Sequence, residues 1–255
     1  MLAVQHLDKH FGGVHATRDV SIDFPDGSLT AIIGPNGAGK TTFFNLISGA
    51  SRPDAGKVVF NGQDIVGKSC VEVVRLGMAR AFQIAALFPS LTVSESLTAA
   101  VTSHQRRAWM LSNRFPLEQA RQAVEEIIEL LGLQAKAHTL SRNLSHGDQK
   151  LLDIGLSLAM KPKVLLLDEP TAGMGPDERW RMIGKVQDLW RAKAMTVLFI
   201  EHDMDIVFKI AQRIHVLKYG AVLAQGTADE IRSNQDVIDA YLGTDHHLAQ
   251  AVGEK

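Results

Sequence analysis

The chain has 255 residues, 45% of them hydrophobic, so it can bury a large core in one domain or in two lobes. Its 27 basic and 28 acidic residues nearly cancel, which excludes a general attraction to nucleic acid, and its single cysteine, Cys70, excludes an internal disulfide. No apolar run approaches the length of a bilayer and no signal-peptide core is present, so we expect a soluble cytoplasmic protein.

The N-terminal region is rich in predicted strands. Leu2–Leu7 alternates weakly, Val20–Phe24 alternates cleanly between apolar and polar residues, and the apolar run Leu29–Ile33 indicates a buried strand. Phe11, which begins a Gly-rich turn, could stack on an adenine ring. A phenylalanine that only anchors the turn explains the same spacing equally well.

A glycine-rich loop follows the buried strand and precedes an apolar stretch with helical spacing. It consists of Gly34, Pro35, Asn36, Gly37, Ala38, Gly39, Lys40, Thr41 and Thr42. This matches G-x-x-x-x-G-K-[ST], in which backbone N–H groups and the helix dipole surround a phosphate. Lys40 adds a positive charge near the terminal phosphates, and the Thr41 hydroxyl can complete a Mg²⁺ shell.

Gly62–Ser69 matches the same pattern, but we interpret it as a false positive. Ile65 and Val66 are β-branched and resist a tight loop with positive φ, and Asp64 would place a carboxylate beside a polyanion. Asn61-Gly62 is more simply the turn that closes a hairpin on the strand Val58–Phe60.

The middle of the chain changes from strands to helices. A helix is predicted over Ser69–Leu76 and a strand over Ala79–Phe82, with Gln83 at its end. On its own, Gln83 is a polar strand terminus. From Leu91 the pattern is helical: Thr92 or Ser94 can cap one helix, and Pro116 begins an amphipathic helix that reaches Leu131.

Leu144–Gln149 opens a further predicted helix, Lys150–Met160. Ser145 and Gly147 at a helix N-terminus can form an anion site, although ordinary capping explains the stretch when it is considered alone.

Two later apolar runs predict central strands that end in polar residues. Val164–Leu167 leads into Asp168, which can hold Mg²⁺, and Glu169, which can polarise an attacking water. Thr196–Ile200 leads into His202, which could reach a γ-phosphate, although a lone histidine is usually structural.

The chain ends in a predicted hairpin and helices. The hairpin strands are Arg213–Leu217 and Ala221–Gln225, and Thr227 caps a helix pair that ends near Tyr241. We assign no metal to His246 and His247 in the tail.

Together these residues resemble the ATP-binding-cassette (ABC) ATPases over nearly the whole chain and in the same order. The resemblance implies an α/β fold, a P-loop NTPase (RecA-like) core with an antiparallel β subdomain and an inserted α-helical subdomain. It makes Gly34–Thr42 the Walker A loop, Gln83 the glutamine that senses Mg²⁺ and γ-phosphate, and Asp168 the Walker B carboxylate. It also makes Glu169 the catalytic base, His202 the switch histidine and Phe11 the adenine-stacking residue.

The signature stretch of that family departs from its usual form here. The common pattern is Leu-Ser-Gly-Gly-Gln, whereas this chain has His146 and Asp148 in place of a glycine and the glutamine; Ser145 and Gly147 remain. The loop after Glu169 also lacks the usual aspartate. Both departures, and the ending Ile238–Gly243, resemble the branch that energises uptake of branched-chain amino acids and of similar solutes such as urea.

The resemblance implies one ABC ATPase domain over residues 1–255, with a core lobe of residues 1–83 and 162–255 and a helical lobe of residues 84–161. It implies ATP and Mg²⁺ as cofactors, and a head-to-tail dimer in which Ser145, His146 and Gly147 of one subunit meet the ATP of the other. The partners are a second ABC ATPase subunit, which can be a copy or a related chain, a transmembrane permease and, indirectly, an extracytoplasmic solute-binding protein.

The implied place is the cytoplasmic face of the plasma (inner) membrane, bound peripherally through the permease, with no nucleic-acid partner. The alternative is a soluble ABC ATPase that acts in DNA repair or in ribosome or cluster assembly. The chain lacks the second cassette and the long basic or coiled-coil insertions that such proteins often carry.

Overall fold

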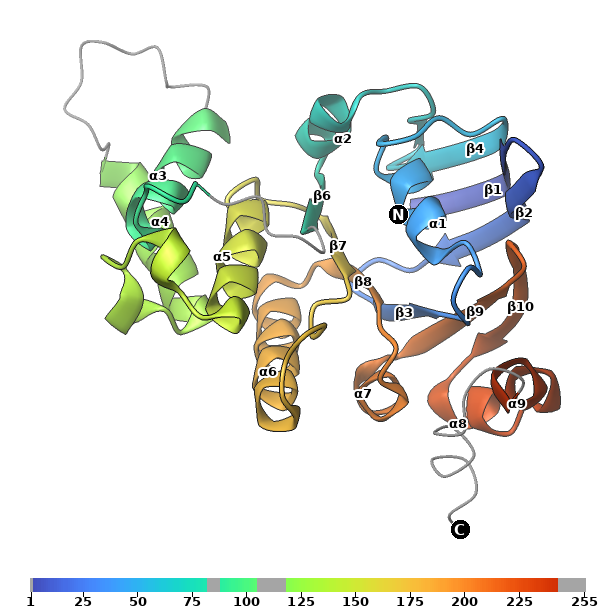
Figure 1. The fold of residues 1–255 in the computed structure, drawn as a ribbon. Helices are drawn as coiled ribbons and strands as arrows, with labels where there is room; N and C mark the ends of the chain where they lie inside the picture. Colours follow the sequence, from blue (N-terminus) through green and yellow to red (C-terminus); the bar gives the residue numbers. More distant parts are fainter. Residues whose placement is uncertain (1, 82–87, 105–117, 243–255) are drawn as a thin grey trace. The chain divides into compact units, whose positions relative to one another are not determined.

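The computed structural model describes residues 2–81, 88–104 and 118–242 (Figure 1). Its contacts divide the chain into two units. Unit 1 contains residues 1–76 and 194–255, and unit 2 contains residues 77–193. Each unit combines strands with helices, so the predicted α/β class is confirmed. The contact division assigns residues 162–193 to unit 2, whereas the sequence analysis places them in the core lobe. The predicted lobe limits therefore stay a functional prediction.

The antiparallel sheet of unit 1 has the strand order β2-β1-β4-β5. Its strands are β1 (Leu2–Phe11), β2 (Val14–Phe24), β4 (Ala55–Phe60) and β5 (Gln63–Asp64). β1 and β2 extend beyond the predicted strands because their ladder continues through polar residues to the pair Phe11↔Val14. Asn61 and Gly62, with φ of 50° and 80°, close the hairpin between β4 and β5, as predicted.

The other strands of unit 1 are arranged in the order β10-β9-β3-β8. They are β3 (Leu29–Ile33), β8 (Thr196–Ile200), β9 (Arg213–Lys218) and β10 (Ala221–Gly226). β3 is parallel to both β8 and β9, and every residue of β3 and β8 is buried. This confirms the prediction that both apolar runs are buried strands, and their pairing is parallel.

One helix of unit 1, α1, follows β3 after the glycine-rich loop. The helices are α1 (Lys40–Ile47), α2 (Cys70–Leu76), α7 (Met204–Ile210), α8 (Ala228–Arg232) and α9 (Gln235–Leu242). Phe43 and Phe44 of α1 are fully buried, and the Phe43 ring lies 6.3 Å from the ring of Phe24 on β2. Each such ring contributes about 2 kcal/mol or more of burial free energy, which fixes the start of α1 beside the sheet.

Unit 2 contains one parallel strand pair, β6 (Met78–Ala81) and β7 (Val164–Asp168), among its described residues. Its helices are α3 (Val93–His104), α4 (Glu118–Leu131), α5 (His146–Leu158) and α6 (Pro176–Lys193). A Cβ added at Gly155 of α5 would lie 2.7 Å from Leu131 and 3.1 Å from Leu97, so this glycine lets α3, α4 and α5 pack closely.

Two helix starts in unit 2 test the predicted caps. Thr92 caps α3, because its hydroxyl accepts from the N–H of Glu95 while the Glu95 carboxylate accepts from the N–H of Thr92. α5 begins at His146 rather than at Lys150, because Ser145 caps it and the signature stretch forms its first turn. The predicted start at Lys150 was therefore wrong. The predicted start at Pro116 lies outside the described residues.

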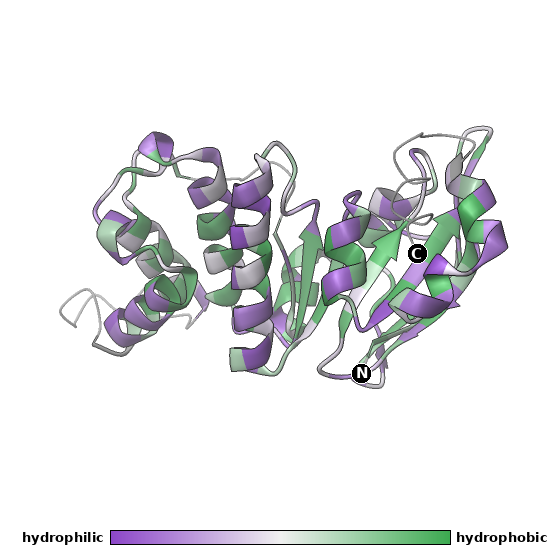
Figure 2. Cartoon of the chain, turned by 90° about the horizontal axis from the view of Figure 1, so that it is seen from below, coloured by the Kyte–Doolittle hydropathy of each residue, from purple (hydrophilic) through white to green (hydrophobic). Residues whose placement is uncertain are grey.

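Figure 2 shows the hydropathy of the residues in both units. The strands are mostly hydrophobic, whereas the helices carry both hydrophilic and hydrophobic residues. This is the pattern of amphipathic helices that cover a buried sheet. Among the described residues, no helix combines the length and the apolar character that crossing a bilayer requires.

Candidate functional site

The predicted phosphate loop joins β3 to α1 in unit 1. Gly34, Gly37 and Gly39 have φ of 153°, 78° and 98°, values that glycine adopts far more easily than other residues. A Cβ at Gly34 would lie 2.1 Å from the carbonyl oxygen of Leu217, and one at Gly39 would lie 2.2 Å from that of Ala16. The loop therefore needs glycine at positions 34 and 39 for steric as well as conformational reasons.

The start of α1 is suited to an anion. Gly39 is its N-cap residue and supplies no side-chain cap, and the first turn carries no acidic residue. The first backbone N–H groups of a helix have no partner within the helix, and the dipole makes this end positive. A phosphate group would satisfy both features.

Lys40 is the loop's cation, and only 7% of it is exposed. Its Nζ donates to the carbonyl oxygens of Gly34 at 2.6 Å and Pro35 at 3.0 Å. The ammonium group is thus held over the loop itself, where it would meet a phosphate seated there. Thr41, by contrast, is exposed at the start of α1.

Two parts of unit 1 that the sequence analysis did not assign to the site contact this loop. The N–H of Gly220, in the turn between β9 and β10, donates to the carbonyl oxygen of Ala38 at 3.1 Å, and the carbonyl of Gly220 accepts from Arg18 at 2.7 Å. Tyr241 of α9 makes a hydrogen bond with the backbone of Gly34, and burial raises the pKa of its phenol well above the usual range. Neither contact is visible in local sequence, because both join segments far apart in the chain.

Phe11 and His202 are both exposed in unit 1. Phe11 ends β1 with 51% of its surface exposed, and the Nζ of Lys9 lies 5.3 Å from its ring centre. His202 follows β8. Because Ile32 pairs with Ile200 in parallel register, Gly34 and His202 continue from the same edge of the sheet. Their roles as adenine-stacking and γ-phosphate residues stay predictions.

In unit 2, Asp168 ends β7 and is 4% exposed. Its Oδ2 accepts from the guanidinium of Arg80 on β6 at 2.6 Å, whereas its buried Oδ1 has no hydrogen-bond partner among the described residues. A buried carboxylate oxygen without a partner fits a hard divalent cation such as Mg²⁺. Arg80 is not predicted from the sequence, because its side chain meets Asp168 only through the alignment of β6 with β7.

Glu169 has an unusual backbone, with φ of 49° in a residue that carries a Cβ. Such conformations cost free energy and persist only where neighbours hold them. Lys150 of α5 is one such neighbour: its Nζ donates to the carbonyl oxygens of Glu169 at 2.8 Å and of Ala172 at 3.1 Å, and it is 5% exposed. The N–H of Ala172 donates to the same Glu169 carbonyl at 3.2 Å. The sequence analysis treated Lys150 only as the start of a helix.

The signature residues form the first turn of α5, also in unit 2. The Ser145 hydroxyl accepts from the N–H of Asp148 at 3.2 Å and donates to its carboxylate at 2.6 Å, and Lys136 pairs with the same carboxylate. Burial opposes ionisation of Asp148, but the hydrogen bonds from Lys136 and Ser145 outweigh it and lower its pKa. Asp148 brings a negative charge where the usual signature has a neutral glutamine, and Lys136 balances that charge.

The other two signature residues lie close to acidic and loop groups of unit 2. Gly147 is buried, and a Cβ there would lie 2.3 Å from the Glu178 carboxylate. His146 is exposed, and its Nε2 lies 3.3 Å from the carbonyl oxygen of Ala172. Gln83, the remaining predicted site residue, lies outside the described residues.

Two family models match this chain. The ABC transporter model covers residues 17–172, and the model called Branched-chain amino acid ATP-binding cassette transporter covers residues 221–247.

Several named proteins are similar along the whole chain. The high-affinity branched-chain amino acid transport ATP-binding protein LivG of Salmonella typhimurium is 38% identical over 251 residues, which cover 95% of this chain and 98% of the relative. The probable LivG of Archaeoglobus fulgidus is 38% identical over 247 residues, which cover 95% of each protein. The ADP conformation of MJ1267, an ATP-binding cassette of an ABC transporter, superposes with a TM-score of 0.82 at 31% identity, covering 95% of this chain and 98% of that one. This similarity confirms the fold class predicted from the sequence.

Proposed function

Because this chain belongs to the ABC transporter family and is therefore an ATPase coupled to transport, we propose that it powers the uptake of branched-chain amino acids or of similar small polar solutes. The support is the full-length similarity to proteins named for this transport, together with the C-terminal model that carries the same name. The alternative of a soluble ABC ATPase for DNA, ribosomes or clusters finds no such support.

The observation that carries the proposal is the built phosphate loop of unit 1. The loop suits one anionic ligand for three reasons. Its three glycines adopt conformations that exclude most side chains, the helix start has no side-chain cap, and Lys40 supplies a buried cation. We assign the ATP phosphates to Gly34–Thr42 and the adenine to Phe11.

Glu169 is the proposed general base for the attacking water, and His202 and Gln83 are the proposed γ-phosphate residues. Lys150 holds the backbone of Glu169, so it acts as a positioning residue for that base. When bound, Mg²⁺ would neutralise charge on the phosphates, with Thr41, Gln83 and Asp168 as its proposed ligands. Asp168 can serve because one of its buried oxygens is available.

The functional unit of this proposal is a head-to-tail dimer, with either a second copy or a related chain as the partner. Ser145, His146 and Gly147 of one subunit complete the ATP site of the other, and hydrolysis reopens the dimer. A permease holds the pair peripherally at the cytoplasmic face of the membrane, and an extracytoplasmic binding protein delivers the solute. In this reading residues 84–161 are the helical lobe that transmits the motion to the permease.

Reconstitution tests the transport function. The chain is affinity-purified from mildly solubilised source membranes, the complex is placed in proteoliposomes, and ATP-dependent uptake of labelled leucine is compared with that of labelled ribose. We expect a polytopic membrane protein to co-purify and leucine uptake to depend on ATP. Recovery of ribosomes or DNA without a membrane protein would reject transport, whereas ribose uptake without leucine uptake would reject the solute class alone.

Glu169→Gln tests the assigned base. The amide keeps the size of the side chain but cannot accept the proton of water, so ATP turnover should fall at least about a hundredfold while ATP affinity changes less than about threefold. Steady-state phosphate release and equilibrium ATP binding measure the two effects. Asp177→Asn, an exposed acidic position at the start of α6, is the matched control and should keep its turnover. Unchanged turnover in Glu169→Gln would refute the assignment.

A further inference from the structure

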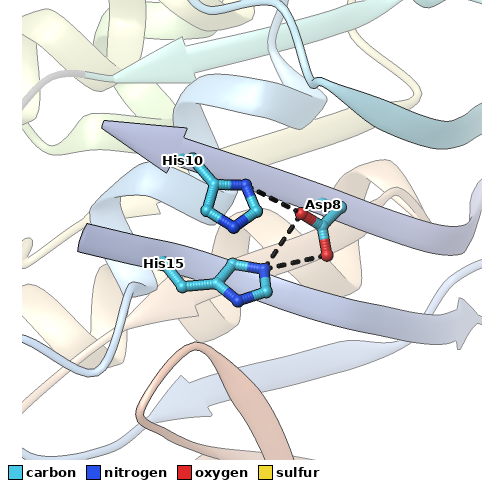
Figure 3. A group of neighbouring side chains, drawn as sticks. All are labelled: Asp8, His10 and His15. Carbon is cyan, nitrogen blue, oxygen red and sulfur yellow. Dashed lines mark hydrogen bonds and ion pairs between the residues drawn. The ribbon is translucent and has the colours of Figure 1, made fainter. Parts of the chain in front are cut away.

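Three side chains with metal-binding atoms gather on the hairpin of β1 and β2, and none of the three has a role assigned above. Asp8 and His10 are two residues apart on β1, and His10 pairs directly with His15 on β2. Figure 3 shows the two imidazole rings stacked, with a nitrogen of each facing the Asp8 carboxylate. The cluster depends on pairing between strands, so local sequence patterns do not reveal it.

The distances suit a shared ligand. Nε2 of His15 lies 2.9 Å from both carboxylate oxygens of Asp8, and Nδ1 of His10 lies 3.2 Å from Oδ1. One such atom from each residue lies within 4.8 Å of the others. Ligand atoms that bind one zinc ion at about 2.1 Å lie roughly 3–4 Å from one another, so the spacing suits a shared ion once the His10 ring turns out of its stack with His15. The rings are 3.8 Å apart and 17° from parallel, and His10, which is half exposed, has room to turn.

The surroundings keep the carboxylate charged. Burial opposes ionisation of Asp8, but hydrogen bonds from His15 and from the N–H of Asp19 outweigh it and lower its pKa. Asp54 lies beside His10, and its Oδ2 accepts from the backbone N–H of His10 at 2.7 Å. Lys9 pairs with the other oxygen of Asp54. These carboxylates supply the negative charge that favours a bound cation.

A hydrogen bond from Arg18 to His15 opposes metal binding. The Nε of Arg18 donates to Nδ1 of His15 at 3.1 Å, which leaves the ring proton on Nε2, facing Asp8. A metal at Nε2 needs that proton on Nδ1 instead, so Arg18 must give up its hydrogen bond. The site therefore favours metals that bind imidazole strongly over Mg²⁺ and Ca²⁺, which prefer oxygen ligands alone.

We propose that Asp8, His10 and His15 form a binding site for a divalent transition metal of the zinc class, with water completing the coordination. The bound ion cross-links β1 and β2 immediately before the turn that carries Phe11. The site uses none of the predicted magnesium ligands and does not depend on the transported solute.

Calorimetric titration of Zn²⁺ into the untagged full-length chain, free of nucleotide and Mg²⁺, tests the proposal. The wild type should bind with a saturable step of one equivalent, and His10→Gln and His15→Gln should each weaken that step at least tenfold. Binding by histidines elsewhere, such as His246 and His247, would persist in these variants. His6→Gln is the matched control, because His6 is an exposed β1 histidine that pairs with Asp19 outside the cluster.

A second readout separates metal binding from folding. Cobalt(II) bound at the site should give visible absorption bands, which both cluster variants lose, while all variants keep the wild-type melting temperature without metal. Should His15→Gln fail to fold, the half-exposed His10 still provides the test. Equal Zn²⁺ affinity in the wild type and in His10→Gln, or an equal loss in His6→Gln, would overturn the proposal.

Discussion

Lys40 and Lys68 occupy the same position in two copies of one sequence pattern, and their surroundings differ. Lys40 is buried over a loop of glycines and donates to two of its carbonyl oxygens. Lys68 follows a hairpin whose turn, Asn61-Gly62, is used to pair β4 with β5. The residues inside each pattern favour Lys40, because β-branched residues resist the tight turns of a phosphate loop and an acidic residue repels the phosphates.

Lys40→Ala should weaken ATP binding at least tenfold, because it removes the cation held at the loop. Equilibrium titration with a fluorescent ATP analogue measures the affinity. Lys68→Ala removes the corresponding lysine of the second copy and should leave affinity within about twofold of the wild type. Equal losses in both variants would contradict our choice of loop.

The role of Lys150 cannot be predicted from the local sequence. Its position on α5 is compatible with an ordinary solvent-facing lysine, and only the packed structure directs its ammonium to the backbone of Glu169 and Ala172. The same limit applies to Arg80, whose partner Asp168 is distant in sequence and adjacent only through strand pairing.

Lys150→Met should lower kcat of ATP hydrolysis about tenfold with little change in KM, because Glu169 would lose the contacts that hold its left-handed backbone. Lys150→Arg keeps a donor and should restore most of the rate. Steady-state kinetics of both variants provide the measurement, with Lys57→Met on an exposed position of β4 as control. A fall in melting temperature with unchanged kcat would show a purely structural lysine.

At the scale of elements, the buried strands β3, β7 and β8 were the easiest to predict. Each is mostly apolar with every position buried, so composition and burial agree. Element ends were harder. β1 and β2 extend through polar residues because pairing, not hydrophobicity, holds their ends, and α5 begins before its apolar stripe because Ser145 supplies the cap. The short helix α7 has too few turns to show a clear period.

His215 on β9 makes a stability prediction at this scale. Its ring packs edge-on against Phe24 at 5.5 Å, and burial, aided by the charge of Arg213 and opposed by the nearby Gln225 side chain, lowers its pKa from 6.5 to about 4. Below pH 6.5, His215 is therefore protonated in the unfolded chain but stays neutral in the folded chain until the pH approaches 4. The stability contributed above pH 6.5 is lost as pH falls toward 4, by about 2 kcal/mol at pH 5.

Urea unfolding of the wild type and of His215→Leu at pH 7.5 and pH 5 measures this term. The wild type should lose about 2 kcal/mol more than the variant between the two pH values, because leucine cannot take up a proton in the unfolded chain. Equal losses would show that other groups govern the acid dependence.

At the scale of the whole molecule, the chain carries the two predicted kinds of nucleotide contact in its two units. Unit 1 holds the phosphate loop, and unit 2 holds Ser145 and Gly147 at the start of α5. Their order along the chain was enough to predict an ABC ATPase, since the motifs are local. The solute, the permease and the identity of the second subunit were not predictable, because they depend on surfaces of other chains.

The size of the Glu169→Gln protein with and without ATP and Mg²⁺ tests the central claim most directly. If ATP joins the phosphate loop of one copy to Ser145 of another, light scattering on a gel-filtration column should show an ATP-dependent dimer of twice the 27.8 kDa chain. The additional substitution Ser145→Arg should abolish that dimer without preventing ATP binding. A Glu169→Gln chain that binds ATP and remains monomeric at all concentrations, or a dimer that Ser145→Arg does not disturb, would contradict the account.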